Sequence, residues 1–146
     1  MIIDILMNNH WILLDVLVCN AGVMSHLSDN VTEDGLELHF SVNYLGHFFM
    51  LQLLKKMLKK SAEPRIIVVS SILLKEGVID LEKLGSPDIE RYKSKGHSTP
   101  PAYCDTKLMC SLFVQEIHKR EPWISAFCVS PGWCKTNLGE YCQSIS

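Results

Sequence analysis

Three short apolar runs alternate with two long amphipathic segments along the chain. The runs are Leu13–Cys19, Arg65–Ser71 and Trp123–Val129, and nearly continuous apolar runs of this length are typical of strands buried in a parallel sheet. Leu36–Lys60 and the segment that begins at Pro101 repeat apolar residues with a period near 3.6, which predicts helices. This alternation indicates an α/β fold with a parallel sheet and crossover helices.

The two predicted helices differ in how clearly their ends are marked. The first is followed by Glu63 and Pro64, and its apolar stripe is formed by Leu38, Val42, Leu45, Phe49, Leu53 and Met57. The second begins at Pro101, because proline suits a first helical turn in which no N–H is needed, and it ends near Arg120. Its stripe is formed by Leu108, Leu112, Phe113 and Ile117.

Small or polar residues follow each predicted strand. Asn20, Ala21 and Gly22 follow the first strand, Ser71 ends the second, and Pro131–Gly132 follows the third. The carboxyl ends of parallel strands meet at one edge of a sheet, where ligands bind in open α/β folds. An ordinary turn explains the first group equally well, and serines also end strands for structural reasons. Asn43, inside the first helix, is either a hydrogen-bonded core amide or a site residue.

Tyr103 and Lys107 lie one turn apart on the same face of the second helix. An ammonium beside a tyrosine favours the phenolate and moves its pKa towards the range in which the group exchanges protons at neutral pH. Taken alone, such a pair is more often structural than functional. The long connection between Leu73 and Ser98 carries glycines, a proline and many charges, and segments of this kind are often functional.

Composition narrows the class of protein. The chain has 146 residues, of which 47% are hydrophobic and 21% charged, with a net charge of −2. These values predict one folded domain over residues 1–146 and give no reason to expect nucleic-acid binding. Polar residues interrupt the apolar start at 1–18, so we expect no secretory leader or membrane span there and an intracellular, most simply cytoplasmic, protein.

The cysteines and histidines show no metal-ligand spacing. The cysteines form no Cys-x-x-Cys pair, and we interpret them as buried, reduced thiols: Cys19, Cys104, Cys110, Cys128, Cys134 and Cys142. His47 lies inside an apolar helix and is better explained as a packed histidine than as a ligand. We therefore expect no metal site.

The ordered set of motifs resembles the classical short-chain dehydrogenase/reductase family. The set comprises Asn-Ala-Gly at a strand end, Asn43 in the next helix, serine at the next strand end, Tyr-x-x-x-Lys and then Pro-Gly. The stretches Val42–Phe48 and Ala102–Lys107 look most like the retinol dehydrogenase and WW-domain oxidoreductase branch. The resemblance implies a three-layer, Rossmann-like α/β fold and an NAD(P)-dependent oxidoreductase that interconverts an alcohol and a carbonyl.

Four residues correspond to the catalytic positions of that family. The resemblance implies that Tyr103 exchanges a proton with the substrate oxygen and that Lys107 lowers its pKa and holds the nicotinamide ribose. Ser71 would bind the substrate oxygen, and Asn43 would support a water molecule linked to Lys107. The branch suggests a lipophilic substrate such as a retinoid, a steroid or another lipid.

Further residues correspond to the cofactor cleft. Asn20, Ala21 and Gly22 would line its adenosine side, while Pro131, Gly132 and Thr136 would contact the nicotinamide end. The cofactor would be NADP or NAD, with NADP favoured by the branch. The glycine-rich turn that binds pyrophosphate in this family has no counterpart before Asp15, and the first glycine is Gly22. We therefore expect a partial domain that contains the family's fourth to sixth strands and lacks the first βαβ half and the C-terminal lid.

This departure leaves two hypotheses. One is an active oxidoreductase. The other is an inactive short isoform or fragment that associates with a full-length relative, or with itself, through the helices Leu36–Lys60 and Tyr103–Lys119. Full-length relatives could then be associated with an organelle membrane. An α/β-hydrolase is less well supported, because Ser70 and Ser71 lack a Gly-x-Ser-x-Gly turn.

Overall fold

The computed structural model describes residues 13–25, 31–89, 92, 99–136 and 138. The elements in chain order are β1 (Val16–Cys19), the π-helical segment η1 (Phe40–Leu45), α2 (Gly46–Leu58), β2 (Arg65–Val69), the 3₁₀ turns η2 (Ile72–Glu76) and η3 (Leu81–Lys83), α4 (Pro101–Arg120) and β3 (Ser125–Val129). The predicted order of strands and helices is confirmed. The strands are shorter than their apolar runs, because each run also includes residues that lead into or out of the strand.

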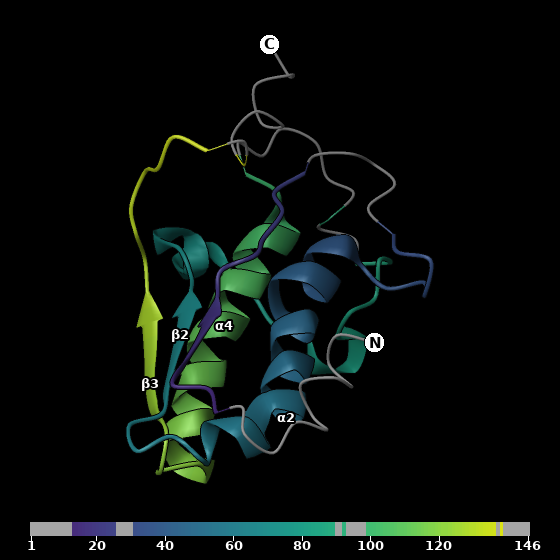
Figure 1. The fold of residues 1–146 in the computed structure, drawn as a ribbon. Helices are drawn as coiled ribbons and strands as arrows, with labels where there is room; N and C mark the ends of the chain where they lie inside the picture. The colour runs from purple at the N-terminus through teal and green to yellow at the C-terminus, as the bar shows by residue number, and fades with distance from the viewer. Residues whose placement is uncertain (1–12, 26–30, 90–91, 93–98, 137, 139–146) are drawn as a thin grey trace.

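The three strands form one parallel sheet in the order β1-β2-β3. Leu17 of β1 lies opposite Ile66 of β2, which in turn lies opposite Ala126 of β3. All three strands therefore point the same way, and their carboxyl ends lie at the end of the sheet where α4 begins (Figure 1). This is the edge at which the sequence predicts a site.

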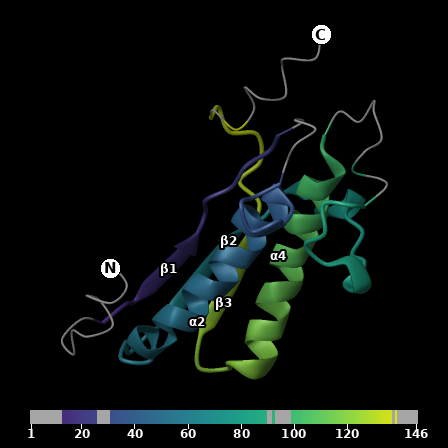
Figure 2. The same cartoon turned by 90° about the vertical axis from the view of Figure 1, so that its right-hand side faces the viewer.

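Both crossover helices pack on one face of the sheet (Figure 2). Alternate strand residues point into this interface, among them Leu17, Ile66 and Ala126. They form one buried core with residues of α2, α4 and the turn before β3: Leu51, Leu54, Met57, Leu58, Cys110, Phe113, Val114, Ile117 and Ile124. The partial Rossmann-like α/β fold is thus confirmed, and the described residues form the sheet and one helix layer.

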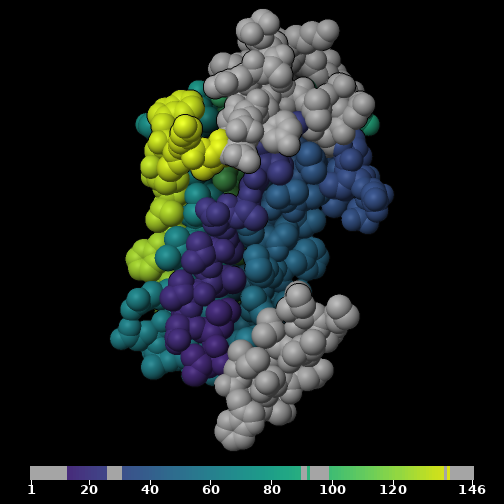
Figure 3. Space-filling view, turned by 45° about the horizontal axis from the view of Figure 1, so that its top comes forward, coloured from purple at the N-terminus to yellow at the C-terminus, as the bar shows by residue number. Residues whose placement is uncertain are grey.

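The opposite face of the sheet carries apolar side chains that no described helix covers. Its exposed members are Val16, Val18, Phe127 and Val129. In Figure 3 the purple atoms of β1 lie at the surface, beside the teal and yellow-green atoms of the other two strands. A parallel sheet is normally covered on both faces, so this face is suited to contact with further protein.

The helices bury only part of the stripe that the sequence period predicts, and Met57 of α2 is one of the residues buried as predicted. Leu51, Leu54 and Leu58 of α2 face the core, whereas Phe49 and Leu53 point outward. On α4, Phe113 and Ile117 are buried as predicted, but Leu112 is exposed. Both helices are therefore apolar on two sides, and the period alone does not decide which side packs on the sheet. No helix in the described ranges has the length and apolar character needed to cross a bilayer.

The packing predicts a sharp difference between two leucines of α2. Leu58 is fully buried and Leu53 is 39% exposed. Leu58→Ala should lower the free energy of unfolding by about 2–5 kcal/mol because it leaves a cavity. Leu53→Ala should change it by about 0.5 kcal/mol or less. Urea denaturation of both variants measures the difference, and equal losses would contradict the assigned helix face.

Candidate active site

The candidate site lies where the carboxyl ends of the strands meet the first turns of α4. Pro101 occupies the first turn of this helix, and the Pro100 carbonyl accepts a hydrogen bond from the Tyr103 amide at 3.0 Å. The helix start therefore places Tyr103 in its first turn and Lys107 one turn further along. These are the positions that the sequence predicts.

Lys107 is the charged group at the centre of this region. Its Nζ lies 5.3 Å from the centre of the Tyr103 ring and donates a hydrogen bond to the Val69 carbonyl at 2.9 Å. Tyr103 and Lys107 are only 5% and 4% exposed. Burial lowers the pKa of Lys107, while Cys110 and Cys128 act in the opposite direction. The expected pairing of phenol and ammonium is thus present, in a nearly closed position.

Asn43 joins this pair to the segment that follows β1. It is fully buried; its Oδ1 accepts from the Val23 N–H at 2.7 Å, and its Nδ2 donates to the Val23 carbonyl at 3.0 Å and to the Thr106 hydroxyl at 3.2 Å. A Cβ built on Gly22 would lie 3.3 Å from Asn43 Oδ1 and 3.8 Å from Lys107 Nζ. Gly22, Asn43 and Lys107 therefore converge closely, as the sequence predicts, and only a small residue fits at position 22.

The backbone carbonyl of Asn43 also accepts hydrogen bonds. It lies in the π-helical segment η1 and accepts from His47 Nδ1 at 3.0 Å and from the Cys110 thiol at 3.3 Å. His47 is a packed histidine, as expected, and burial lowers its pKa. The water-supporting role of Asn43 stays a prediction. π-Helical segments often mark functional sites, because they shift backbone groups out of the regular helical pattern.

The two serines at the end of β2 have different surroundings. Ser70 is buried, and its hydroxyl donates to the Lys107 carbonyl at 2.7 Å, so it fastens the strand to α4. Ser71 is only partly buried, and its hydroxyl accepts from the Leu73 N–H at 3.3 Å. Ser71 is therefore the less buried of the two serines at the strand end. Its role towards a substrate stays a prediction.

The remaining predicted cofactor residues lie along the same edge. Asn20 and Ala21 are exposed just after β1, and Pro131, Gly132 and Thr136 are exposed after β3. Their role in cofactor binding stays a prediction that rests on position.

One sequence interpretation is wrong for part of the chain. Cys19, Cys104 and Cys110 are buried as predicted, but Cys128 and Cys134 are exposed, while Cys142 lies outside the described residues. Cys128 is near the end of β3 and Cys134 follows it, where nothing described covers them. Burial raises the pKa of Cys19 to about 12 and that of Cys110 to about 11, which keeps these thiols protonated. No cluster of metal-ligating side chains occurs among the described residues.

Comparison with known sequences decides the family. The sequence model for short chain dehydrogenases matches residues 5–82, more than half of the chain. The chain belongs to the short chain dehydrogenase family.

Individual relatives agree with the predicted branch of this family. Retinol dehydrogenase 14 of Mus musculus is 41% identical over 130 residues, which cover 88% of this chain and 36% of that protein. The WW domain-containing oxidoreductase of Pongo abelii is 42% identical over 109 residues, or 73% of this chain and 26% of that protein. The chain therefore spans little more than a third of the length of the dehydrogenases it matches.

Solved structures support the same fold. A protein of Mycobacterium paratuberculosis superimposes with a TM-score of 0.67 and 32% identity, covering 89% of this chain and 46% of that one. A gluconate 5-dehydrogenase of Burkholderia cenocepacia, solved with NADP and tartrate, gives a TM-score of 0.62 at 21% identity, covering 94% of this chain and 47% of that one. The second likeness concerns the fold alone.

Sequence reasoning missed a buried pair at the start of the first helix of this short chain dehydrogenase. His39 Nδ1 lies 2.7 Å from Glu37 Oε1, and His39 Nε2 accepts from the Ser25 N–H at 3.0 Å. The other carboxylate oxygen of Glu37 accepts from the Phe40 N–H at 2.7 Å. Two polar residues two positions apart, inside an otherwise apolar segment, were the available signal.

Asp105, inside the Tyr-x-x-x-Lys motif, is a second missed residue. It is almost fully buried and accepts from the Tyr92 hydroxyl at 2.8 Å and from the Val78 N–H at 2.7 Å. The carboxylate thereby fastens the long segment after β2 to α4, next to the proposed site.

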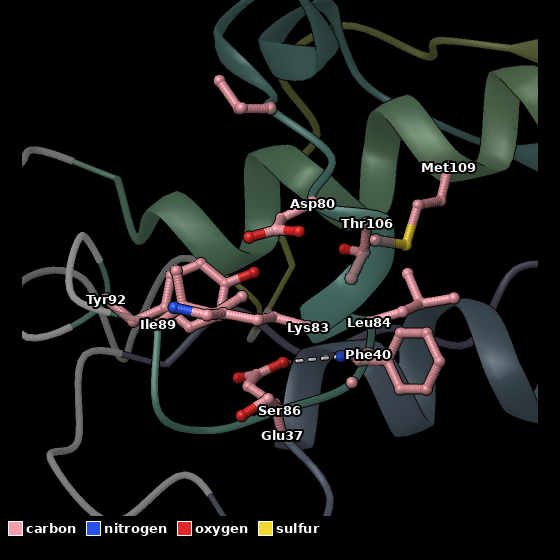
Figure 4. Close-up of a pocket in the computed structure, with 12 residues that line it drawn as sticks. Glu37, Phe40, Asp80, Lys83, Leu84, Ser86, Ile89, Tyr92, Thr106 and Met109 are labelled. Atoms are coloured by element: carbon pink, nitrogen blue, oxygen red, sulfur yellow. Dashed lines mark hydrogen bonds between the residues drawn. The ribbon is translucent and has the colours of Figure 1, made fainter.

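A small cavity lies between this long segment, the start of the first helix and α4 (Figure 4). Glu37, Asp80, Lys83, Tyr92 and Thr106 are among its lining residues, and its volume is about 10 Å³. This is room for about one water molecule, whereas substrate pockets are far larger. A cavity of this size is too small for a substrate of the size that enzyme pockets hold.

Lys107 gives the unfolding equilibrium a predictable pH dependence. Because burial lowers its pKa, the folded state binds this proton less tightly than the unfolded chain does. The contribution of Lys107 to the free energy of unfolding should therefore increase as the pH rises from neutral towards 10.5, the ordinary pKa of a lysine. In Lys107→Met this contribution should be absent.

Urea denaturation of the wild type and Lys107→Met across this pH range tests the expectation. The difference in unfolding free energy between the two proteins should shift in favour of the wild type as the pH rises. The other titrating groups are the same in both proteins, so their contributions to this difference largely cancel. A difference that does not change with pH would contradict the burial of a charged Lys107.

Proposed function

We propose that the chain carries the proton-transfer half of an NAD(P)-dependent oxidoreductase that interconverts an alcohol and a carbonyl. The observation that supports this most directly is the buried Lys107 ammonium over the Tyr103 ring, with Gly22 and Asn43 beside it. Membership of the short chain dehydrogenase family supports the reaction class. In this proposal, residues 1–146 form a single partial domain that contains the family's fourth to sixth strands.

The chain's residues would handle the proton and the substrate oxygen. Tyr103 would give a proton to the oxygen in reduction and take it in oxidation. Lys107 favours the phenolate because its positive charge lies beside the ring, and this eases release of the proton. Ser71 would donate a hydrogen bond to the same oxygen and stabilise the charge that develops on it.

The close approach at Gly22 is compatible with a cofactor at this edge. A Cβ at position 22 would enter the space between Asn43 and Lys107. Lys107 would hold the nicotinamide ribose, Asn20, Ala21 and Gly22 the adenosine side, and Pro131, Gly132 and Thr136 the nicotinamide end. The bound nicotinamide supplies the hydride chemistry. NADP is the first cofactor to test, because the branch that the sequence resembles favours it.

A lipophilic alcohol or carbonyl, such as a retinoid, a steroid or another lipid, is the proposed substrate. The names of the relatives support this choice, because several of them are retinol dehydrogenases.

Tyr103→Phe tests the reaction class. Turnover of all-trans-retinal with NADPH should fall by a factor on the order of 100 to 10,000, because the ring remains but the proton donor is lost. Binding of NADPH, followed by nicotinamide fluorescence, should change little. The thermal midpoint should stay close to that of the wild type.

Tyr44→Phe is the matched control. Tyr44 packs in an aromatic cluster with Phe40, Phe48 and Phe113, so losing its hydroxyl should leave turnover unchanged. Near wild-type turnover in Tyr103→Phe would overturn the assigned role. If the wild type binds neither NADPH nor NADH, the oxidoreductase proposal fails for this chain.

A second candidate function, association with a full-length relative or a second copy, has its own structural support. Phe49 and Leu53 of α2 and Leu112 of α4 point away from the core and are exposed. These residues lie on the two helices through which we expect pairing from the sequence. Burying them between chains would remove apolar surface from water.

Leu112→Glu tests this contact, and Leu81→Glu is its control. The two leucines are 41% and 79% exposed, but Leu81 lies on η3, away from the helix pair. Sedimentation velocity over a range of concentrations should show association of the wild type and of Leu81→Glu, and a clear loss of association in Leu112→Glu. Identical behaviour of all three proteins would contradict pairing through these helices.

A further inference from the structure

The buried Glu37–His39 pair contacts several segments that surround the proposed site. His39 is fully buried and its ring meets the Tyr103 ring edge-on, with the ring centres 6.5 Å apart. The same imidazole binds the Ser25 amide, and the Glu37 amide donates to the Gly85 carbonyl at 3.0 Å. The pair therefore joins the segment after β1, the long segment after β2, and the start of α4.

The hydrogen bonds fix the protonation pattern of His39. The Ser25 N–H can only donate, so Nε2 must act as the acceptor and carry no proton. In a neutral imidazole the proton then lies on Nδ1, where it is donated to Glu37. Glu37 is itself fixed by the Phe40 N–H, and this arrangement orients the ring. Both ring nitrogens of His39 thus have partners.

Two side chains of the first helical segment form hydrogen bonds with the backbone of the segment that follows β1. Asn43 binds both backbone groups of Val23, and His39 binds the amide of Ser25. The two residues are four positions apart, so they share one helix face. Gly22, immediately before these anchors, is the residue that lies against Asn43 and Lys107.

We propose that His39, oriented by Glu37, is a positioning residue that fixes the segment 20–25 and thereby sets cofactor affinity. The cofactor part of this inference rests on the proposed function, whereas fixation of the segment does not. His39 contacts the Tyr103 ring edge-on, but the inferred effect on cofactor affinity does not depend on that contact. His39 acts through the Ser25 amide, and the loss of that bond removes one of the hydrogen bonds that hold the segment that carries Gly22.

Two substitutions at position 39 test the two hydrogen bonds of the imidazole one at a time, because each can keep one bond and lose the other. The side-chain amide of His39→Asn reaches the position of Nδ1, so it can keep the bond to Glu37 but offers Ser25 no acceptor. The longer side chain of His39→Gln places its carbonyl oxygen near the position of Nε2, so it can keep the bond to Ser25.

The first measurement is hydrogen exchange of the Ser25 amide by NMR on the full chain. Exchange in His39→Asn should be faster than in the wild type by a factor of about ten, because the amide loses its buried acceptor. His39→Gln should exchange nearly as the wild type does. Equal exchange in all three proteins, or equal acceleration in both variants, would overturn the inference.

The second measurement is NADPH affinity by nicotinamide fluorescence with the same proteins. The dissociation constant should rise by about tenfold in His39→Asn and recover in His39→Gln. Faster Ser25 exchange without a change in affinity would overturn the cofactor part of the inference. No binding by the wild type would instead overturn the proposed function, and Ser25 exchange would still decide whether His39 fixes the segment.

A third measurement needs no variant and therefore does not depend on the folding of one. Nitrogen-15 NMR of the wild-type imidazole at neutral pH should show His39 protonated at Nδ1 and unprotonated at Nε2. A proton on Nε2 would exclude the Ser25 bond and overturn the inference directly.

Discussion

A buried ammonium group requires that its surroundings supply hydrogen bonds and polar neighbours, and Lys107 imposes this requirement on the fold. The Val69 carbonyl at the end of β2 accepts its hydrogen bond, and the Tyr103 ring lies under its charge. Ser70 fastens the backbone of Lys107 to the same strand. The depressed pKa shows that burial still outweighs these contacts. Such a group is costly for stability, and sites of proton chemistry are where such costs are commonly found.

Much of this arrangement could be predicted from the sequence because it depends on local pattern. Apolar runs of strand length predicted β1, β2 and β3, and the order of elements predicted a parallel sheet. Pro101 predicted the start of α4, and four-residue spacing then placed Tyr103 beside Lys107. The convergence of Gly22 with Lys107 follows from topology, since parallel strands end at the same edge.

Other features depend on which surfaces meet, and local pattern does not contain that information. α2 is apolar on two sides, so the sequence period chose Phe49 and Leu53, whereas the sheet buries Leu51 and Leu54. The role of His39 depends on Ser25, which belongs to a segment that ends before the helix begins. Cys128 was expected to be buried because its run is apolar, yet the strand end that carries it is not covered by any described residue.

The hydrogen bonds that Asp105 accepts from Val78 and Tyr92 have a consequence for how such a protein can diversify. Val78 and Tyr92 are both tied to this carboxylate, so the chain between them is a loop closed at its base. Lengthening a closed loop costs little conformational entropy, since the cost grows only with the logarithm of its length. Insertions between Val78 and Tyr92 would therefore leave the helix that carries Tyr103 in place. Sequence change in that loop could reshape the surroundings of the site while the chemistry stays constant.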